Sequence, residues 1–319
     1  MSTTGMEDVP HLGWIKTHKK DAEGKTYSFL FKSKVEEISD EERANKMAAA
    51  LSAIPAIHLP EPAAYDAKNL IAFIPINDLH AGGYAWSPET GYGNWDIDTA
   101  TSRLTTWVGE LINELPLVDE CILFFNGDTL HTNGKLPITP ANAHILDSDS
   151  RFYNAVDQTA AAIMVAIDLA AQRFNRVRVV IKRGNHDEDS HVTLKMAAKY
   201  RYLNTPNVIV DEDPSPYWVH PFGNVLLFGH HGDRVAPKDL VMKLAADHRK
   251  EWGQSKHCVV WTAHKHQREM KTFYGATWEQ ASCLTEPDAY GAYWGSHAML
   301  QAVVYDKDRG EIKRFTVQS

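Results

Sequence analysis

Residues 70–80 read LIAFIPINDLH, an apolar run that leads directly into Asp78 and His80. The run is too short for a buried helix but has the length of a buried strand. Four more runs of this kind follow along the chain, and each also leads into residues that can bind a metal ion. They are CILFF (121–125) before Gly127-Asp128, VRVVI (177–181) before Gly184-Asn185-His186-Asp187, VLLF (225–228) before Gly229-His230-His231-Gly232, and CVVW (258–261) before Thr262-Ala263-His264-Lys265-His266.

Longer segments with helical periodicity separate these predicted strands. Apolar residues recur at intervals of three and four from Leu104 to Leu115 and again from Val156 to Phe174. This spacing predicts amphipathic helices, and strands that alternate with such helices indicate an α/β fold whose sheets are covered on their outer faces. After Trp261 the pattern changes to short strands and turns (KTFYG, TWEQASC, AMLQAVVYD and EIKRFTV), which predicts mostly antiparallel strands there.

The N-terminal part reads as a small extension, residues 1–66, ahead of a main domain of residues 67–319. The segments GWIKTHKK (13–20) and KTYSFLFK (25–32) flank DAEGK (21–25) and predict a hairpin. DEERANKMAAALSAI (40–54) then predicts a short helix, and the three prolines of IPAIHLPEPAAYD (54–66) indicate a linker.

Composition sets the class of protein. With 319 residues, 44% hydrophobic and 23% charged, the chain falls in the ordinary globular range. It contains no run of about 18 apolar residues and no basic start followed by an apolar core, so we expect no membrane span and a cytoplasmic protein of the producing or host cell. The 3 cysteines form no CxxC pair, and the net charge of −8 argues against a surface built to grip long nucleic acids.

The polar residues after the five predicted strands suit a shared metal site. Ligands bind beyond the carboxyl ends of strands in open α/β sheets, so five strand ends can surround one point. Carboxylate, imidazole and amide donors without thiolate suit Mn²⁺, Fe or Zn²⁺. The candidate ligands exceed the needs of one ion and fit two ions about 3.5–4 Å apart that share a carboxylate. These ligands are Asp78, His80, Asp128, Asn185, His231, His264 and His266.

The order Asp-x-His, Gly-Asp, Gly-Asn-His-Asp, His-Gly and His-x-His resembles the ordered motif set of the calcineurin-like metallophosphoesterases. It covers residues from about 70 to 270. One such motif occurs often by chance, whereas five in this order at strand ends form a specific signal. The resemblance implies a four-layer α-β-β-α sandwich of two mixed sheets, preceded here by the small N-terminal extension.

The resemblance also implies a role for each candidate ligand. The first metal is assigned to Asp78, His80 and His266, and the second to Asn185, His231 and His264, with Asp128 bridging both. His186 is expected beside the scissile phosphate as a proton donor, with Asp187 as its orienting partner or as a supporting group. We expect two divalent ions, Mn²⁺ first, with Fe, Zn and Ni as alternatives.

Departures from the family pattern narrow these expectations. The protein-phosphatase branch continues its second motif as Gly-Asp-x-x-Asp-Arg-Gly, whereas this chain has Gly127-Asp128-Thr129-Leu130-His131, which disfavours a phosphoprotein substrate. Ala263 stands where glycine is usual in the fifth motif, and both histidines are kept. His230 and His231 compete for the fourth position, and the His-Gly pattern selects His231.

Six further residues are candidates for substrate contact. Tyr84 and Trp86 follow the first motif, where aromatic rings either stack on nucleobases or pin down a long loop. His131 opens a long polar insertion of the kind that often sets specificity. Arg183, His230 and Arg234 adjoin the candidate ligands, and the alternative to a phosphate contact is ordinary surface polarity.

The resemblance is nearest to nuclease-like members, related to double-strand-break repair nucleases, and to uncharacterised bacteriophage phosphoesterases. It implies a phosphodiesterase acting on DNA or another nucleic acid through a hydroxide that bridges the metals. One alternative is a phosphodiesterase or phosphatase of small or cyclic nucleotides, and a second is a non-catalytic scaffold of the same fold. Whether the chain forms a homodimer is left open.

Overall fold

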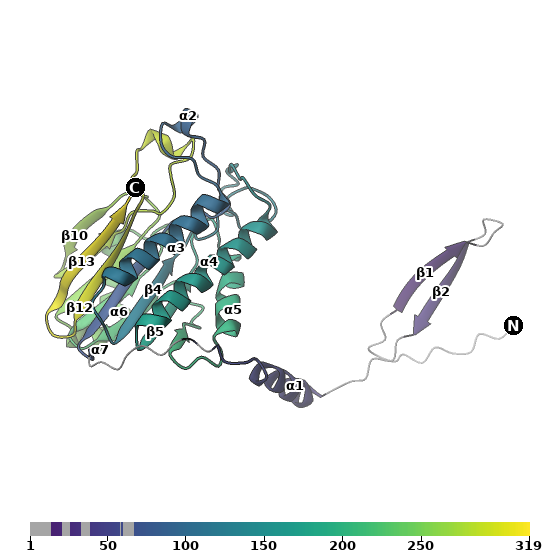
Figure 1. The fold of residues 1–319 in the computed structure, drawn as a ribbon, viewed down its shortest axis with the longest axis horizontal. Helices are drawn as coiled ribbons and strands as arrows, with labels where there is room; N and C mark the ends of the chain where they lie inside the picture. The colour runs from purple at the N-terminus through teal and green to yellow at the C-terminus, as the bar shows by residue number, and fades with distance from the viewer. Residues whose placement is uncertain (1–13, 21–25, 33–38, 58, 60–66) are drawn as a thin grey trace. The chain divides into compact units, whose positions relative to one another are not determined.

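The computed structural model describes residues 14–20, 26–32, 39–57, 59 and 67–319 (Figure 1). The chain divides into two units, residues 1–53 and 54–319. The predicted boundary at residue 66, the turn at 21–25 and most of the proline-rich linker lie outside the described residues.

The smaller unit contains a hairpin and one helix. Strands β1 (Trp14–Lys20) and β2 (Thr26–Lys32) pair in antiparallel register, as the sequence predicted. Helix α1 (Asp40–Ser52) also lies where it was predicted. Its first turn is capped by the hydroxyl of Ser39, which accepts a hydrogen bond from the backbone N–H of Glu42 at 3.1 Å.

The larger unit contains a six-stranded sheet in the order β13-β12-β3-β4-β5-β6. Neighbouring strands from β3 to β6 are parallel, and β12 is antiparallel to both of its neighbours. The predicted apolar runs before the first three motifs form β3, β4 and β5. The bounds are β3 (Leu70–Ile76), β4 (Glu120–Asn126), β5 (Arg176–Lys182), β6 (Val208–Val210), β12 (Met299–Asp306) and β13 (Gly310–Gln318).

A second, five-stranded sheet has the order β10-β11-β9-β8-β7. Strands β8, β9 and β11 are parallel, and the edge strands β7 and β10 are antiparallel to their neighbours. The parallel pairing of β11 with β9 is an exception to the antiparallel pattern predicted after Trp261. The bounds are β7 (Trp218–Phe222), β8 (Val225–Gly229), β9 (His257–Thr262), β10 (Glu269–Phe273) and β11 (Ala276–Gln280).

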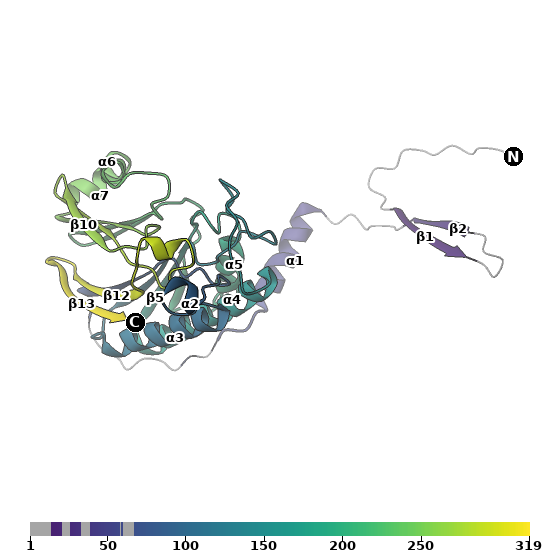
Figure 2. The same ribbon diagram turned by 90° about the horizontal axis from the view of Figure 1, so that it is seen from above.

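Helices cover the outer face of each sheet (Figures 1 and 2). α3 (Ile97–Glu114), α4 (Phe152–Arg173) and α5 (His191–Arg201) pack their apolar faces on the six-stranded sheet. α6 (Pro237–Asp247) and α7 (Arg249–Gln254) pack on the five-stranded sheet. Two short elements, α2 (Ser87–Thr90) and η1 (Gly291–Tyr293), lie in connecting segments. None of the helices in the described part of the chain has the length and apolar character needed to span a bilayer.

The inner faces of the two sheets pack against each other through a cluster of aromatic side chains. Phe73 and Phe124 of the first sheet contact Trp218 and Trp261 of the second, with ring centroids between 5.0 and 5.8 Å apart. This cluster and the two helix layers give the predicted four-layer α-β-β-α sandwich. Because β3 and β4 belong to one sheet and β8 and β9 to the other, the face-to-face packing brings their carboxyl ends together.

The close approach of the sheets predicts which glycine tolerates a side chain. A methyl group at Gly229, the last residue of β8, would lie 2.2 Å from Cζ of Phe124. Gly229→Ala should therefore lower the free energy of unfolding by about 1–3 kcal/mol in urea titrations. Gly253→Ala in α7 is the matched control because nothing lies within 4 Å of the new methyl group, and it should be neutral or stabilising. Equal stability of the two variants would contradict this description of the interface.

Candidate metal centre

The five motifs lie at the carboxyl ends of β3, β4, β5, β8 and β9. The loops after β3 and β4 are joined through their backbones: the N–H of His80 donates to the carbonyl of Asp128 at 2.9 Å. The loops after β8 and β9 are joined in the same way, from the N–H of Ala263 to the carbonyl of His231 at 2.8 Å. These bonds fix neighbouring loops relative to one another, so the side chains that they carry are held close together.

Several candidate ligands adopt a left-handed backbone conformation. Seven non-glycine residues in the described part of the chain have a positive φ, and five of them are candidate ligands. Such conformations cost free energy for non-glycine residues and are concentrated at functional sites. The five are Asp78, His80, Asp128, His264 and His266, with φ between 45° and 75°.

One group of ligand atoms comes from Asp78, His80 and His266, and these atoms lie within 4.8 Å of one another. Nε2 of His80 lies 3.1 Å from Nε2 of His266, which is 3.7 Å from Oδ1 of Asp78. Two imidazole nitrogens and a carboxylate oxygen therefore lie close together, and all three come from residues assigned to the first metal in the sequence analysis.

A second group comes from Asp128, His231 and His264, again with ligand atoms within 4.8 Å of one another. Nε2 of His231 lies 3.1 Å from Oδ2 of Asp128 and 3.1 Å from Oδ1 of Asn185. The same Oδ2 of Asp128 lies 3.8 Å from Nε2 of His80. Asp128 therefore stands between the two groups, in the position expected of a bridging carboxylate.

The electrostatics of these groups fit bound cations. Asp78 and Asp128 are fully buried, and in the described part of the chain their ion-pair partners are histidines, not lysine or arginine. Burial raises the pKa of Asp78 to about 8. Burial opposes a charge on His231, yet the carboxylates of Asp128 and Asp78 outweigh it and raise the pKa of His231 to about 10. The buried carboxylates therefore attract positive charge, which a proton on His231 supplies in the metal-free site and which divalent cations would supply in its place.

The remaining imidazoles are held in the form that binds metal. Burial lowers the pKa of His264 and of His266 to about 4. Both rings are therefore neutral at pH 7, with a lone pair free for a cation. Together with the amide oxygen of Asn185, this donor set of nitrogen and oxygen suits a divalent transition metal.

Asp187 supports the loops of the site. Its buried carboxylate accepts hydrogen bonds from the backbone N–H groups of Asp128, Thr129, Leu130 and Gly184, at 2.7 to 3.3 Å. It thereby ties the loop after β4 to the loop after β5. Of the two roles expected for Asp187, orienting partner of His186 or supporting group, these bonds correspond to the second.

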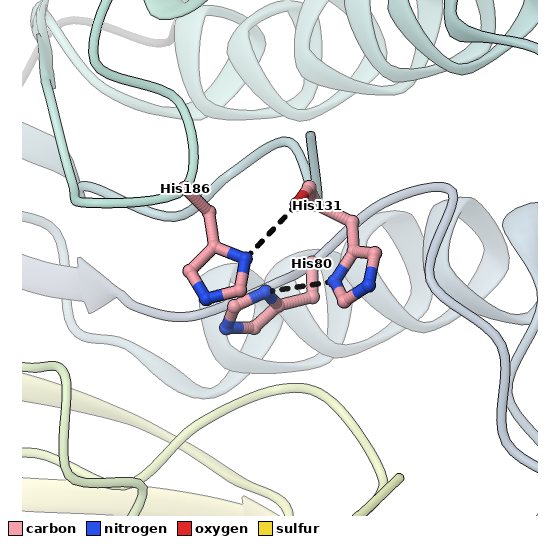
Figure 3. A group of neighbouring side chains, drawn as sticks. All are labelled: His80, His131 and His186. Carbon is pink, nitrogen blue, oxygen red and sulfur yellow. Dashed lines mark hydrogen bonds between the residues drawn. The ribbon is translucent and has the colours of Figure 1, made fainter. Parts of the chain in front are cut away.

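The ring of His186 is oriented by a different residue. Its Nδ1 lies 2.9 Å from the carbonyl oxygen of His131, and its own backbone N–H donates to Oδ1 of Asp128 at 2.8 Å. The rings of His186 and His80 meet edge to face with centroids 4.6 Å apart. The predicted proton donor therefore lies directly beside His80, one of the three residues of the first ligand group (Figure 3).

His131, a candidate for substrate contact, is buried, with 4% of its surface exposed. Its Nδ1 lies 3.2 Å from Nδ1 of His80 (Figure 3). His80, His131 and His186 form a third group whose ligand atoms lie within 4.8 Å of one another. The ring is thus part of the histidine cluster and is largely closed to solvent.

The two candidate arginines are engaged in ion pairs. Arg183 lies 3.3 Å from Glu188 and 3.6 Å from Asp233. Arg234 pairs with the same two carboxylates. A substrate phosphate would have to compete with these carboxylates for either guanidinium.

The side chain of His230 packs differently from that of His231. Its ring stacks on Tyr217 with centroids 4.8 Å apart, and its Nδ1 accepts a hydrogen bond from the N–H of Gly232 at 2.9 Å. Burial lowers the pKa of His230 to about 4. His231, the predicted ligand, is therefore the histidine of this pair that lies in the ligand group.

Tyr84 and Trp86 are exposed, with 45% and 53% of their surfaces accessible. Their loop is held by Trp95, which is buried and donates from Nε1 to the carbonyl of His80 at 3.3 Å. Reciprocal backbone bonds between Ala85 and Trp95 complete the attachment. The pinning role considered for the loop aromatics thus belongs to Trp95, and Tyr84 and Trp86 extend into solvent.

A segment far along the chain borders the site and was not identified from the sequence. The N–H groups of Leu284 and Thr285 donate to the carbonyls of Asn77 and Asp78 at 3.1 and 3.2 Å. Burial lowers the pKa of His131 to about 4, and the charge of Asp288, three residues after Thr285, partly opposes this shift. Leu284 and Thr285 act through backbone N–H groups, which every residue except proline has, and Asp288 acts through a single carboxylate. These residues therefore form no apolar run and no metal-ligand spacing that could be recognised in the sequence.

No protein-family model matches this chain, and no curated protein matches it. Among solved structures it is similar to an archaeal phosphodiesterase, with 12% identity over 78% of this chain and 99% of the other and a TM-score of 0.37. A predicted phosphoesterase from Streptococcus pneumoniae has 12% identity over 78% and 98%, with a TM-score of 0.30. A Vps29 variant from Entamoeba histolytica has 13% identity over 78% and 99%, with a TM-score of 0.33. Similarity at this level transfers no activity.

Metal binding by these residues predicts a thermal shift. Adding Mn²⁺ to metal-free protein should raise Tm by several degrees, because saturation at 100 times Kd stabilises a protein by about 2.7 kcal/mol. Asp128→Asn should lose most of this shift, since Asp128 stands between both ligand groups. Asp168→Asn, which alters an ion pair with Arg201, is the control and should keep it. The same shift in all three proteins, measured by calorimetry, would refute a bridging role.

Proposed function

We propose that this chain is a dinuclear-metal phosphodiesterase that hydrolyses a nucleic acid. One observation carries the proposal: Asp128 stands between two adjacent ligand groups, near His231 of its own group and His80 of the other, and a partly exposed histidine, His186, lies beside them. Metal ligands alone would suit a structural site. Seven ligands for two ions with an adjacent imidazole suit hydrolysis of a phosphoester.

The candidate ligands would bind two cations. Asp78, His80 and His266 would hold one cation, and Asn185, His231 and His264 the other, with Asp128 between them. When bound, the cations supply positive charge to the phosphoryl oxygens and acidify a water molecule.

His186 would act on the leaving group. Because its Nδ1–H is engaged by the carbonyl of His131, its Nε2 is the nitrogen left to face a substrate. In hydrolysis the oxygen of water forms a bond to phosphorus, the bond from phosphorus to the leaving oxygen breaks, and that oxygen takes up a proton. A protonated His186 can donate it from Nε2.

A nucleic acid substrate is supported by the exposed aromatic residues near the site. Tyr84 and Trp86 are exposed, and the loop that carries them is attached to the backbone of His80 by Trp95. Exposed aromatic rings next to phosphate chemistry suit stacking on unpaired bases. A small nucleotide would stack on the same rings. The salt dependence of binding distinguishes the two substrate classes, because affinity for a nucleic acid polymer falls steeply with rising salt and affinity for a small nucleotide responds little.

The role of His186 predicts a separation of metal binding from turnover. His186→Ala should still bind Mn²⁺ but hydrolyse an aryl phosphodiester about 10²–10⁴-fold more slowly, because the leaving oxygen loses its proton donor. His191→Ala is the control, since this histidine lies at the start of α5 and bonds to the carbonyl of Asp187. Steady-state kinetics with saturating Mn²⁺ measure the effect. Unchanged turnover in His186→Ala would exclude the assigned role.

Stacking predicts a dependence on bases. Trp86→Ala should weaken binding of a short single-stranded thymidine oligonucleotide about 5- to 150-fold, since each stacked base contributes about 1–3 kcal/mol. An abasic oligonucleotide of the same length should bind the wild type and Trp86→Ala equally weakly. Tyr274→Asn is the control because it removes an exposed tyrosine from the turn between β10 and β11. Fluorescence anisotropy in EDTA measures binding without cleavage, and equal binding of both oligonucleotides by the wild type would contradict stacking.

A further inference from the structure

We infer that His131 is a positioning residue for the metal centre: its ring sets which nitrogen of His80 carries the proton, and its carbonyl orients His186. The inference rests on the proposed role of His80 as a metal ligand. It gives His131 a function that differs from the substrate contact expected for it.

The two nitrogens of the His80 ring face different neighbours. Nε2 points into the ligand groups, 3.1 Å from Nε2 of His266 and 3.8 Å from Oδ2 of Asp128. Nδ1 points the other way and lies 3.2 Å from Nδ1 of His131 (Figure 3). A cation held by the first group therefore meets Nε2, and His131 meets Nδ1.

The chemistry of imidazole fixes the direction of this hydrogen bond. A neutral ring has one N–H and one lone pair, so a metal ligand that uses Nε2 must carry its proton on Nδ1. Nδ1–H of His80 then donates to the lone pair on Nδ1 of His131, whose own proton is on Nε2. The opposite direction would leave Nε2 of His80 protonated and unable to bind a metal. Metal-binding histidines are commonly held by such a partner for the second nitrogen.

The surroundings of His131 hold the acceptor in place. Its backbone N–H donates to the carbonyl of Ala81 at 3.1 Å, which attaches it to the loop that carries His80. Gly83 lies directly against the ring, since a methyl group there would be 3.1 Å from Cγ and Nδ1 of His131. With 4% of its surface exposed, the ring has little freedom to turn away from His80.

The backbone of the same residue holds His186. Its carbonyl oxygen accepts a hydrogen bond from Nδ1 of His186 at 2.9 Å. This bond also argues against a metal ion held by His80, His131 and His186 together, because the nitrogen of His186 nearest to His131 is already engaged. His131 therefore connects a metal ligand with the proposed proton donor.

A pair of substitutions isolates the acceptor on the ring. Asn at position 131 can present its side-chain oxygen where Nδ1 lies, whereas Leu has similar bulk and no acceptor. His131→Leu should bind Mn²⁺ about 10–100-fold more weakly than the wild type, and His131→Asn within a few-fold of it. Metal titration by calorimetry measures both, with urea midpoints to check folding. Equal weakening in the two variants, or no weakening in either, would overturn the inference.

A measurement on the unmodified chain covers the case in which His131→Leu does not fold. In metal-free protein labelled with ¹⁵N-histidine, long-range proton–nitrogen correlation spectra assign the protonated nitrogen of each ring. We expect His80 as the Nδ1–H form, and an Nε2–H form would overturn the inference. Neither experiment depends on hydrolysis. A protein that shows the predicted metal affinities and tautomer but cleaves no phosphoester would refute the proposed function and leave this inference standing.

Discussion

Two buried carboxylates surrounded by imidazoles are the constraint on which the rest of this structure depends. Asp78 and Asp128 stand at the ends of neighbouring parallel strands, shielded from solvent and without a lysine or arginine partner in the described part of the chain. In such surroundings negative charge is costly unless positive charge lies between the side chains, either a proton on His231 or bound metal cations. The aromatic contact between the two sheets makes this possible, because it brings the histidines that follow β8 and β9 close to the carboxylates that follow β3 and β4.

The same constraint explains the strained backbone at the site. A left-handed conformation at Asp78, His80 and Asp128 turns each side chain towards a common point immediately after a straight strand. The free energy for these conformations comes from the loops around them, which are joined by backbone hydrogen bonds and by the carboxylate of Asp187. A rigid framework therefore holds the ligands in place, as precise metal coordination requires.

Much of the fold could be predicted from the sequence, because apolar runs of strand length alternate with segments of helical period. The exceptions have physical reasons. β7 contains His220 and Pro221 within its five residues, and β6 is three residues long, so neither gives an apolar run of normal length. The parallel pairing of β11 with β9 joins strands separated by β10, and local pattern carries no information on such a pairing.

The candidate site could be predicted as a set of residues but not in its supporting contacts. The order of the motifs predicts which residues are ligands, and the hydrogen-bonded loops bring these residues together in the structure. The directions of side chains in those loops do not follow from spacing. The sequence therefore left two roles open for Asp187, without naming the backbone N–H groups that its carboxylate binds, and it did not indicate that the ring of His131 meets His80. The backbone bonds of Leu284 and Thr285 to Asn77 and Asp78 cross about two hundred residues of sequence and leave no motif.

The most direct test of the account is a crystal grown with Mn²⁺ and measured near the manganese absorption edge. Two anomalous peaks about 3.5–4 Å apart are predicted, one bounded by Asp78, His80 and His266 and the other by His231 and His264, with Asp128 touching both. The absence of any peak among these side chains, or a single ion elsewhere in the molecule, would contradict the account.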